Sequence, residues 1–422
     1  MVISRQSDVT VSMATNMIDD KCVRCGACLS VCPVYEATLK ERFSPRGKNY
    51  LIHASGIDRG QGLVRETIKA CLQCGACSAV CTSGADVCAL IRSQRAVHRF
   101  FRTLPYPVYN LFSHQNLAKF AIKAADLIPS SDKVGKSDTG SLKTIFQGYK
   151  SATKFLGRHN PPFLASPSEW TRRYLEKARH IEFKEPVPQI AFFVGCSQNM
   201  LFSQVAAKVS AIFNGQISIP VDQVCCGLPA FSAGATGYVK RAISKNLEAL
   251  ENEEFDILLT ACASCASMIK KWPQVFEKGS KEWHRASAIS EKVMEFSQAA
   301  LEFLRPANCT AGRIVSFQMP CHQRYDLSKG DDPLRLLERN LGKGFRYGQS
   351  GCCGQGGLFG FARPDLSAQI FKKTIASIGE DVRLLTTTCS GCLLRLKIGL
   401  SGHIADKRNT LACHVVDTIV PD

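Results

Sequence analysis

The chain has 422 residues, enough for two to four domains, and its 45% hydrophobic and 21% charged residues are typical of a globular protein. Residues 1–17 lack the apolar core of a signal peptide, and no stretch of about 20 apolar residues predicts a membrane-spanning helix. These features argue against a secreted disulfide scaffold, so we interpret most of the 21 cysteines as metal ligands of a cytoplasmic protein.

The formal net charge of +17 is spread along much of the chain. A solvated basic surface explains it, and so does a docking face for an acidic partner or an anionic membrane surface. No nucleic-acid-binding motif accompanies the charge, so no nucleic acid partner is expected.

The first motif in chain order is a duplicated cysteine run. Each copy has the spacing Cys-x-x-Cys-x-x-Cys-x-x-x-Cys, and the copies are 49 residues apart. The eight cysteines are Cys22, Cys25, Cys28, Cys32, Cys71, Cys74, Cys77 and Cys81. Zinc would need two separate Cys-x-x-Cys pairs, and no histidine follows a pair as c-type haem attachment requires. The runs therefore predict two cubane [4Fe–4S] clusters of the ferredoxin type, whose expected role is electron relay.

The fourth cysteine of each run is expected to serve the other cluster, as it does in two-cluster ferredoxins. One cluster then takes Cys22, Cys25, Cys28 and Cys81, and the other takes Cys71, Cys74, Cys77 and Cys32. Gly26 and Gly75, inside the runs, allow close approach of the backbone. The second run ends in Cys81-Thr82 rather than Cys-Pro, a departure that leaves the ligands unchanged.

A longer repeat fills the C-terminal half of the chain. Five cysteines recur about 127 residues apart, with Cys-Cys-Gly at the centre and Cys-x-x-Cys at the end of each copy. The ten are Cys196, Cys225, Cys226, Cys262, Cys265, Cys321, Cys352, Cys353, Cys389 and Cys392. Five thiols exceed the four ligands of tetrahedral zinc, so each copy suits one multi-iron site. The three remaining cysteines are expected to be small buried apolar side chains, namely Cys88, Cys309 and Cys413.

Short apolar runs precede the first and last cysteines of each copy, at 190–194, 257–259, 314–317 and 382–385. Helix-like stretches lie between them, at 239–250 and 366–378. This alternation predicts α/β units with the cysteines at strand ends, where open α/β sheets bind ligands. The predicted fold class is α+β with α/β modules. Its parts are a two-cluster ferredoxin-like helical domain (1–100), a helical or irregular connecting region (101–185), and two cysteine-rich domains (186–305 and 306–422).

The longer repeat resembles a known domain. Its spacing, Cys-x(28)-Cys-Cys-Gly-x(34)-Cys-x-x-Cys in the first copy, is similar to the cysteine-rich domain of heterodisulfide reductases. Residues 44–52, Ser-Pro-Arg-Gly-Lys-Asn-Tyr-Leu-Ile, resemble a stretch between the cluster motifs of glycolate-oxidase-type subunits. The whole chain thus resembles the family that joins the heterodisulfide reductase catalytic subunit to the glycolate oxidase iron–sulfur subunit. This resemblance implies a noncubane [4Fe–4S] cluster on the five cysteines of each copy, where Gly227 and Gly354 would admit it closely.

The resemblance also implies a function. The chain is expected to be an electron-transfer subunit that relays electrons between an FAD-containing 2-hydroxy-acid dehydrogenase subunit (glycolate or lactate type) and a further carrier or membrane subunit. The flavin is expected on that partner because no flavin or nucleotide motif is evident in this sequence.

Two alternatives stay open. The noncubane clusters themselves could reduce a disulfide, with His322 beside Cys321 either donating a proton or serving as a structural residue. The chain could also be a metal-binding scaffold without a redox role. The expected location is the cytoplasm, with peripheral attachment to the cytoplasmic face of the inner membrane as a further option.

Overall fold

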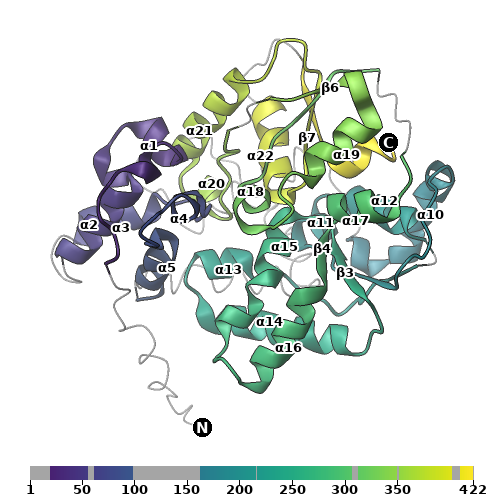
Figure 1. Cartoon of the computed structure of the whole chain (residues 1–422), viewed down its shortest axis with the longest axis horizontal. Helices are drawn as coiled ribbons and strands as arrows, with labels where there is room; N and C mark the ends of the chain where they lie inside the picture. Colours follow the sequence, from purple (N-terminus) through teal and green to yellow (C-terminus); the bar gives the residue numbers. More distant parts are fainter. Residues whose placement is uncertain are drawn as a thin grey trace, which may run out of the picture.

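The computed structural model describes residues 20–55, 61–97, 162–214, 216–306, 312–348, 351–401 and 409–421. A small helical domain stands at one end of the molecule, beside two modules that each contain a small sheet (Figure 1). The predicted α+β class with α/β modules is confirmed. Residues 101–161 of the predicted connecting region, and Cys309, lie outside the described part of the chain.

The N-terminal domain consists of short helices around the duplicated cysteine runs. They are η1 (Ala27–Leu29), α1 (Pro33–Thr38), η2 (Glu41–Phe43), α2 (Pro45–Ser55), α3 (Gln61–Lys69), α4 (Ala76–Ala79) and α5 (Val87–Val97). Helices η1 and α4 begin directly after Gly26 and Gly75, whose φ angles are 86° and 78°. Glycine adopts this left-handed conformation without a steric penalty, which accounts for its place in both turns. Arg24 and Gln73, two residues earlier, share a φ of 59°, so the two runs have the same local backbone conformation.

Two sheets of identical strand order confirm that the C-terminal half is a duplication. The first module (residues 190–306) has four parallel strands in the order β2-β1-β3-β4, and the second module (residues 312–421) has four in the order β6-β5-β7-β8. The strands are β1 (Ile190–Phe192), β2 (Ile217–Ser218), β3 (Ile257–Thr260), β4 (Val293–Glu295), β5 (Val315–Phe317), β6 (Phe345–Arg346), β7 (Leu384–Thr387) and β8 (Leu411–His414). Strands β1, β3, β5 and β7 fall on the four apolar runs of the sequence.

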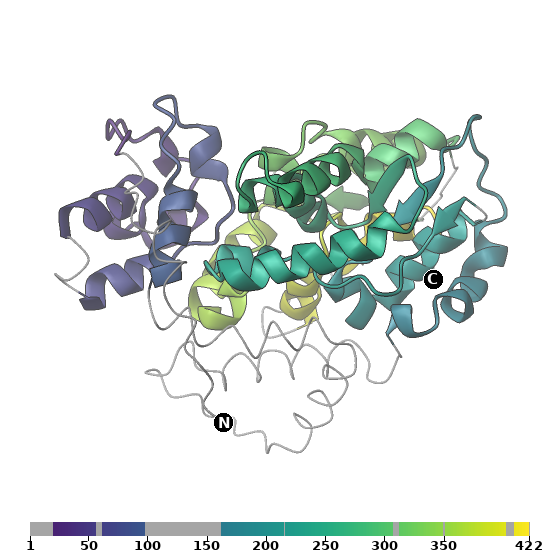
Figure 2. The same ribbon diagram turned by 90° about the horizontal axis from the view of Figure 1, so that it is seen from below.

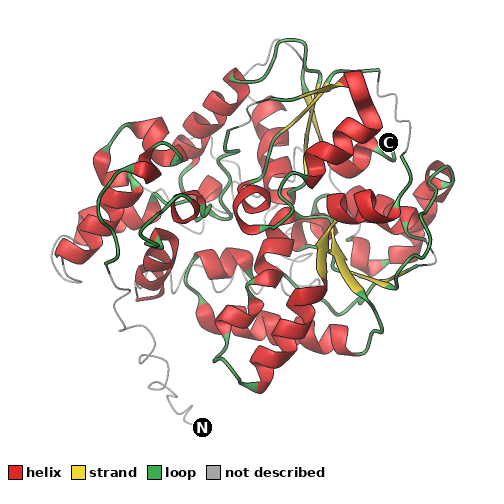
Figure 3. Ribbon diagram, in the orientation of Figure 1, coloured by secondary structure: helices red, strands yellow, loops and turns green. Residues whose placement is uncertain are grey.

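Helices cover the sheets (Figure 3). Those of the first module are α11 (Cys196–Met200), α12 (Ser203–Ile212), α13 (Leu228–Ser232), α14 (Thr236–Glu251), α15 (Ala263–Lys270), η4 (Trp272–Val275), α16 (Lys281–Lys292) and α17 (Phe296–Phe303). Those of the second module are α18 (Cys321–Asp326), α19 (Asp332–Leu341), η5 (Gly342–Gly344), α20 (Phe359–Ala362), α21 (Pro364–Ala376), α22 (Ser390–Ser401) and η6 (Val415–Thr418). Helix α14 contains the predicted stretch 239–250, and α21 covers most of 366–378.

One hydrophobic core runs through both modules. Phe192 and Leu259 of the first sheet belong to the same buried cluster as Phe317 and Leu385 of the second. The described end of the predicted connecting region, η3 (Phe163–Ala165) and α10 (Pro167–Ala178), joins this core through Trp170, and α10 packs on α12. Apolar burial of this kind, at about 25 cal/mol per Å², fixes how the two modules face each other.

The N-terminal domain contacts both modules, as the view from below also shows (Figure 2). Helix α1 packs on α21 of the second module. Arg95 of α5 donates a hydrogen bond of 2.6 Å to the carbonyl of Ser232, at the end of α13 in the first module. The cysteine runs are therefore held against the Cys-Cys-Gly modules rather than on a separate arm.

A buried ion pair also joins the modules. The Lys208 ammonium of α12, fully buried, lies 2.7 Å from the Asp417 carboxylate in η6. Removing one partner of a buried pair leaves an uncompensated charge, which costs about 3–5 kcal/mol. We predict that Asp417→Ala lowers the free energy of unfolding by about 3 kcal/mol, measured by anaerobic urea denaturation. Asp381→Ala, which breaks the exposed Arg346–Asp381 pair, is the control and should cost less than about 1 kcal/mol. Equal effects of the two substitutions would contradict this role.

Candidate iron–sulfur sites

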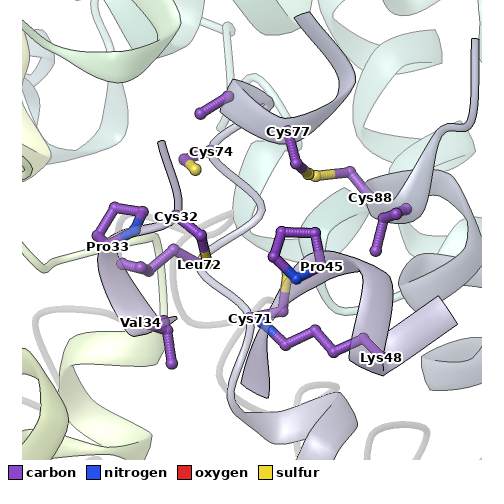
Figure 4. Close-up of a pocket in the computed structure, with 12 residues that line it drawn as sticks. Cys32, Pro33, Val34, Pro45, Lys48, Cys71, Leu72, Cys74, Cys77 and Cys88 are labelled. Atoms are coloured by element: carbon purple, nitrogen blue, oxygen red, sulfur yellow. The ribbon is translucent and has the colours of Figure 1, made fainter. Parts of the chain in front are cut away.

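A cavity in the N-terminal domain is lined by five cysteines, which we call the second-run cavity (Figure 4). Its thiols belong to Cys32, Cys71, Cys74, Cys77 and Cys88. Cys32 comes from the first run and the next three from the second, the combination that exchange of the fourth ligand requires. The fifth, Cys88, lies outside both runs. No pattern in the sequence points to it, because the residue 49 positions earlier is Leu39.

The Ser-Pro-Arg-Gly-Lys segment holds the two runs in place. Arg46 pairs with Glu41 at 2.7 Å and donates a hydrogen bond of 3.4 Å to the carbonyl of Arg24, inside the first run. Lys48, two residues further, is 2% exposed and extends along the second-run cavity toward Cys71 (Figure 4). A Cβ at Gly47 would overlap the carbonyl of Glu41, so only glycine fits between them. The segment thus places one positive charge near each run.

The first run is more open to solvent. Cys25 is exposed, whereas Cys22 and Cys28 are half-buried. Burial, together with the neighbouring thiols of Cys22 and Cys32, raises the pKa of Cys28.

Cys81 is the fourth cysteine of the second run. It lies 3.3 Å from the Ser83 hydroxyl and accepts a hydrogen bond of 3.3 Å from the Ala85 amide, and these bonds lower its pKa.

The five cysteines of the first module gather at the carboxyl ends of its strands. Cys196 opens α11 after β1, and Cys262 and Cys265 flank the start of α15 after β3. Their thiols form a hydrogen-bonded chain in the order Cys196, Cys225, Cys226, Cys265 and Cys262. Hydrogen bonds from Cys225 and Cys265 lower the pKa of Cys226 to about 6. These hydrogen bonds favour the thiolate form of Cys226, the form that binds metal.

The second module repeats this arrangement. Its thiols are hydrogen-bonded in the order Cys352, Cys353, Cys392 and Cys389. Cys321, at the start of α18, is close enough to Cys353 and Cys389 for their charges to raise its pKa further, after burial has raised it. The amides of Gly354 and Gln355 donate to the sulfurs of Cys352 and Cys353 at 3.4 and 3.5 Å. Amide donors of this kind stabilise thiolates and tune the potentials of iron–sulfur clusters.

The glycines after the paired cysteines have a backbone role. Gly227 and Gly354 have φ angles of 95° and 82°, which side chains adopt rarely. A Cβ at Gly354 would also lie 2.7 Å from the carbonyl of Ser367. Glycine is therefore required at these positions by the turn itself and, at Gly354, by its packing on α21.

The two modules bring their thiols into contact. Cys262 of the first module hydrogen-bonds with Cys389 of the second. Ser264, between the paired cysteines of the first module, lies 3.0 Å from the sulfur of Cys389. The ten module cysteines therefore form one group, which we call the thiol array. Its two halves face each other because the carboxyl ends of both sheets point to the same interface.

The second-run cavity adjoins this array. Cys74 lies close enough to Cys321 and Cys352 for their thiols to interact electrostatically. A Cβ at Gly75, the next residue, would lie 3.7 Å from the carboxylate of Asp326 in α18. The cysteines thus run without interruption from the second run through the second module to the first. The sequence predicts each group but not this order, which depends on how the domains pack.

His322 lies at the boundary between the modules. Burial lowers its pKa, and its Nδ1 is 2.8 Å from the hydroxyl of Ser264. Asp326, one turn along α18, accepts a hydrogen bond of 2.6 Å from Ser267 and pairs with Lys271 at 2.7 Å. These contacts join α15 to α18, so His322 has a structural role whether or not it transfers protons.

The residues present fit iron–sulfur clusters. The cysteines form three groups, which are the first run, the second-run cavity and the thiol array, and several of their thiols accept backbone N–H bonds. In the part of the chain that the structure describes, no three His, Cys, Asp or Glu side chains converge as closely as the ligands of a single ion would. None of the twenty cysteines described is in a disulfide.

The charge of Lys48 is expected to influence the reduction potential of a cluster bound in the second-run cavity. A positive charge beside a cluster stabilises the extra electron of its reduced form. Lys48→Met should therefore lower the reduction potential of the second-run cluster by several tens of millivolts, measured by anaerobic titration followed by electron paramagnetic resonance. Lys40→Met, at an exposed lysine of the same domain, serves as the control and should leave it unchanged. A matching shift in both variants would show that only net charge matters.

Comparison with known proteins identifies the parts of the chain. The model of the 4Fe-4S dicluster domain matches residues 19–85, and that of the cysteine-rich domain matches residues 190–270 and 315–397. The chain is 26% identical to the probable glycolate oxidase iron-sulfur subunit of Bacillus subtilis (strain 168), over 91% of this chain and 92% of that protein. It is 27% identical to lactate utilization protein A 2 of Bacillus cereus (strain Q1), over 55% of this chain and 97% of that protein.

These matches agree with the resemblance inferred from the cysteine spacing. Among the described residues, none of the helices combines the length and the apolar character that crossing a membrane requires. The chain therefore carries a 4Fe-4S dicluster domain followed by two cysteine-rich domains, and over most of its length it is similar to a probable glycolate oxidase iron-sulfur subunit.

Proposed function

We propose that this chain is the electron-transfer subunit of a multi-subunit oxidoreductase. It relays electrons between an FAD-containing subunit that oxidises a 2-hydroxy acid of the glycolate or lactate type and a further acceptor. The observation that carries the proposal is the uninterrupted line of cysteines from the second-run cavity through the thiol array. The names of the relatives, a glycolate oxidase subunit and a lactate utilization protein, support the substrate class.

The ligand assignment is part of the proposal. Two cubane clusters take Cys22, Cys25, Cys28, Cys81 and Cys71, Cys74, Cys77, Cys32. Two noncubane clusters take Cys196, Cys225, Cys226, Cys262, Cys265 and Cys321, Cys352, Cys353, Cys389, Cys392. When bound, such clusters supply one-electron redox centres. The proposed path of electrons from one cluster to the next rests on the thiol contacts described above.

The first run and the first module differ in exposure. Cys25 in the first run is exposed, whereas Cys226, Cys262 and Cys265 in the first module are buried. An external electron carrier therefore has direct access to the first run. The cytoplasm suits this chemistry because thiols stay reduced there, and any attachment to the inner membrane would come from a further subunit.

A second candidate is reduction of a disulfide at the thiol array. The bridge from His322 through Ser264 to Cys389 favours it, since it sets a histidine between the two modules. Against it, seven of the ten array cysteines are buried, which restricts the access of a substrate disulfide. The relay explains all three cysteine groups, including the exposed first run, and we prefer it.

The relay is tested with the complex that the chain forms. The chain is purified anaerobically with its partners, and glycolate- or lactate-dependent reduction of a dye is measured. Co-purification of an FAD subunit and dye reduction are expected. Disulfide reduction by the chain alone, without hydroxy-acid activity of the complex, would favour the second candidate.

Cys74→Ser tests the relay at the junction with the second module. We predict that it removes or alters one cubane signal in the electron paramagnetic resonance spectrum and slows electron transfer from the hydroxy acid to the distal acceptor at least about tenfold, or about 1.4 kcal/mol in barrier. Cys413→Ser, at a half-buried cysteine of β8 outside the three groups, is the matched control and should behave as the unsubstituted protein. Unchanged cubane signals in Cys74→Ser would contradict the assignment of the second run.

His322→Gln separates the two candidates. Glutamine keeps a hydrogen-bonding group toward Ser264 but cannot supply a proton at neutral pH. We predict that dye reduction by the complex stays within about threefold of the unsubstituted protein, under 1 kcal/mol in barrier. A loss of more than about a hundredfold, with cluster spectra unchanged, would show that proton transfer at His322 belongs to the reaction.

A further inference from the structure

Cys88 is placed differently from an ordinary buried cysteine. It is 5% exposed and lies on α5, outside both cysteine runs and outside the matched dicluster domain. Its thiol points into the second-run cavity and hydrogen-bonds with both Cys71 and Cys77. Figure 4 shows Cys77 and Cys88 pointing toward each other from α4 and α5. The cavity therefore offers five thiols to a cluster that binds four.

The position of Cys88 is fixed by its helix. Arg95, two turns further along α5, donates hydrogen bonds of 2.8 and 2.7 Å to the carbonyls of Ile68 and Cys71. Leu90 and Ile91 are buried in the core of the N-terminal domain. Helix α5 is thus tied to the start of the second run, which keeps the fifth thiol beside the two it contacts.

The first run has no equivalent thiol. Duplication by 49 residues relates Cys71 to Cys22 and relates Cys88 to Leu39. Leu39 is 77% exposed and ends α1 in a left-handed conformation. The two halves of the N-terminal domain share the spacing of their cysteine runs but not a thiol at this position, and this difference provides an internal control.

We propose that Cys88 is a reserve ligand of the second-run cluster. Its thiol binds iron when the thiol of Cys71 or Cys77 is absent. This inference rests on the ligand assignment made above for the relay. In the exchange, the Cys88 thiol releases its proton to solvent and its sulfur forms a bond to the iron left without a ligand. No electron is transferred. Because Cys88 already contacts both sulfurs, a change of side-chain rotamer suffices.

The test compares matched alanine variants of the full chain, isolated anaerobically. Cys71→Ala and Cys77→Ala should keep the iron and acid-labile sulfide content of the unsubstituted protein, with one shifted cubane signal in the electron paramagnetic resonance spectrum. Cys22→Ala, the equivalent of Cys71→Ala in the first run, should lose iron and its four-iron signal. Adding Cys88→Ala to Cys71→Ala should cause the same loss at the second run, while Cys88→Ala alone keeps all iron.

Two results would overturn the proposal. One is loss of the second-run signal in Cys71→Ala and Cys77→Ala to the same extent as in the double variant that combines Cys71→Ala with Cys88→Ala. The other is loss of that signal in Cys88→Ala alone, which would make Cys88 an obligatory ligand. Circular dichroism checks that each variant is folded. Absence of any cubane signal in the unsubstituted protein would instead refute the ligand assignment, so the two failures are distinguishable.

Discussion

A thiolate buried in protein needs a positive group beside it, and the rest of the structure depends on this constraint. Burial raises the pKa of Cys74 and of Cys321, which keeps these thiols protonated on their own. Iron would supply the missing charge, so binding of a cluster would deprotonate these thiols. The buried core shared by both modules holds the thiols in place before that charge arrives.

Duplication of both cysteine motifs brings many thiols close together. Each sheet gathers five cysteines at the carboxyl ends of its strands, and the shared core turns these ends toward each other. Contact between Cys262 and Cys389 is the consequence. The N-terminal domain then adds a second duplicated pair at one side, with Cys74 at the junction. Two local repeats in this way produce one continuous line.

The sequence predicts whatever depends on local spacing. Cysteine spacing identified the runs and modules, and apolar runs located β1, β3, β5 and β7, because strand ends and tight turns are set by neighbouring residues. The contact between Cys262 and Cys389 depends on packing of residues far apart in the chain, so spacing contains no sign of it. Cys88 is buried, as predicted, but it also lines the second-run cavity, because α5 folds back over the run.

Adjacency of the sites is tested most directly by electron paramagnetic resonance of the fully reduced protein. Paramagnetic centres held by neighbouring thiols broaden or split each other's signals. The arrangement predicts such an interaction between the second-run cluster and the second module, and its loss in Cys352→Ser, where one thiol facing Cys74 is removed. Sharp, independent signals in the unsubstituted protein, unchanged by Cys352→Ser, would contradict it.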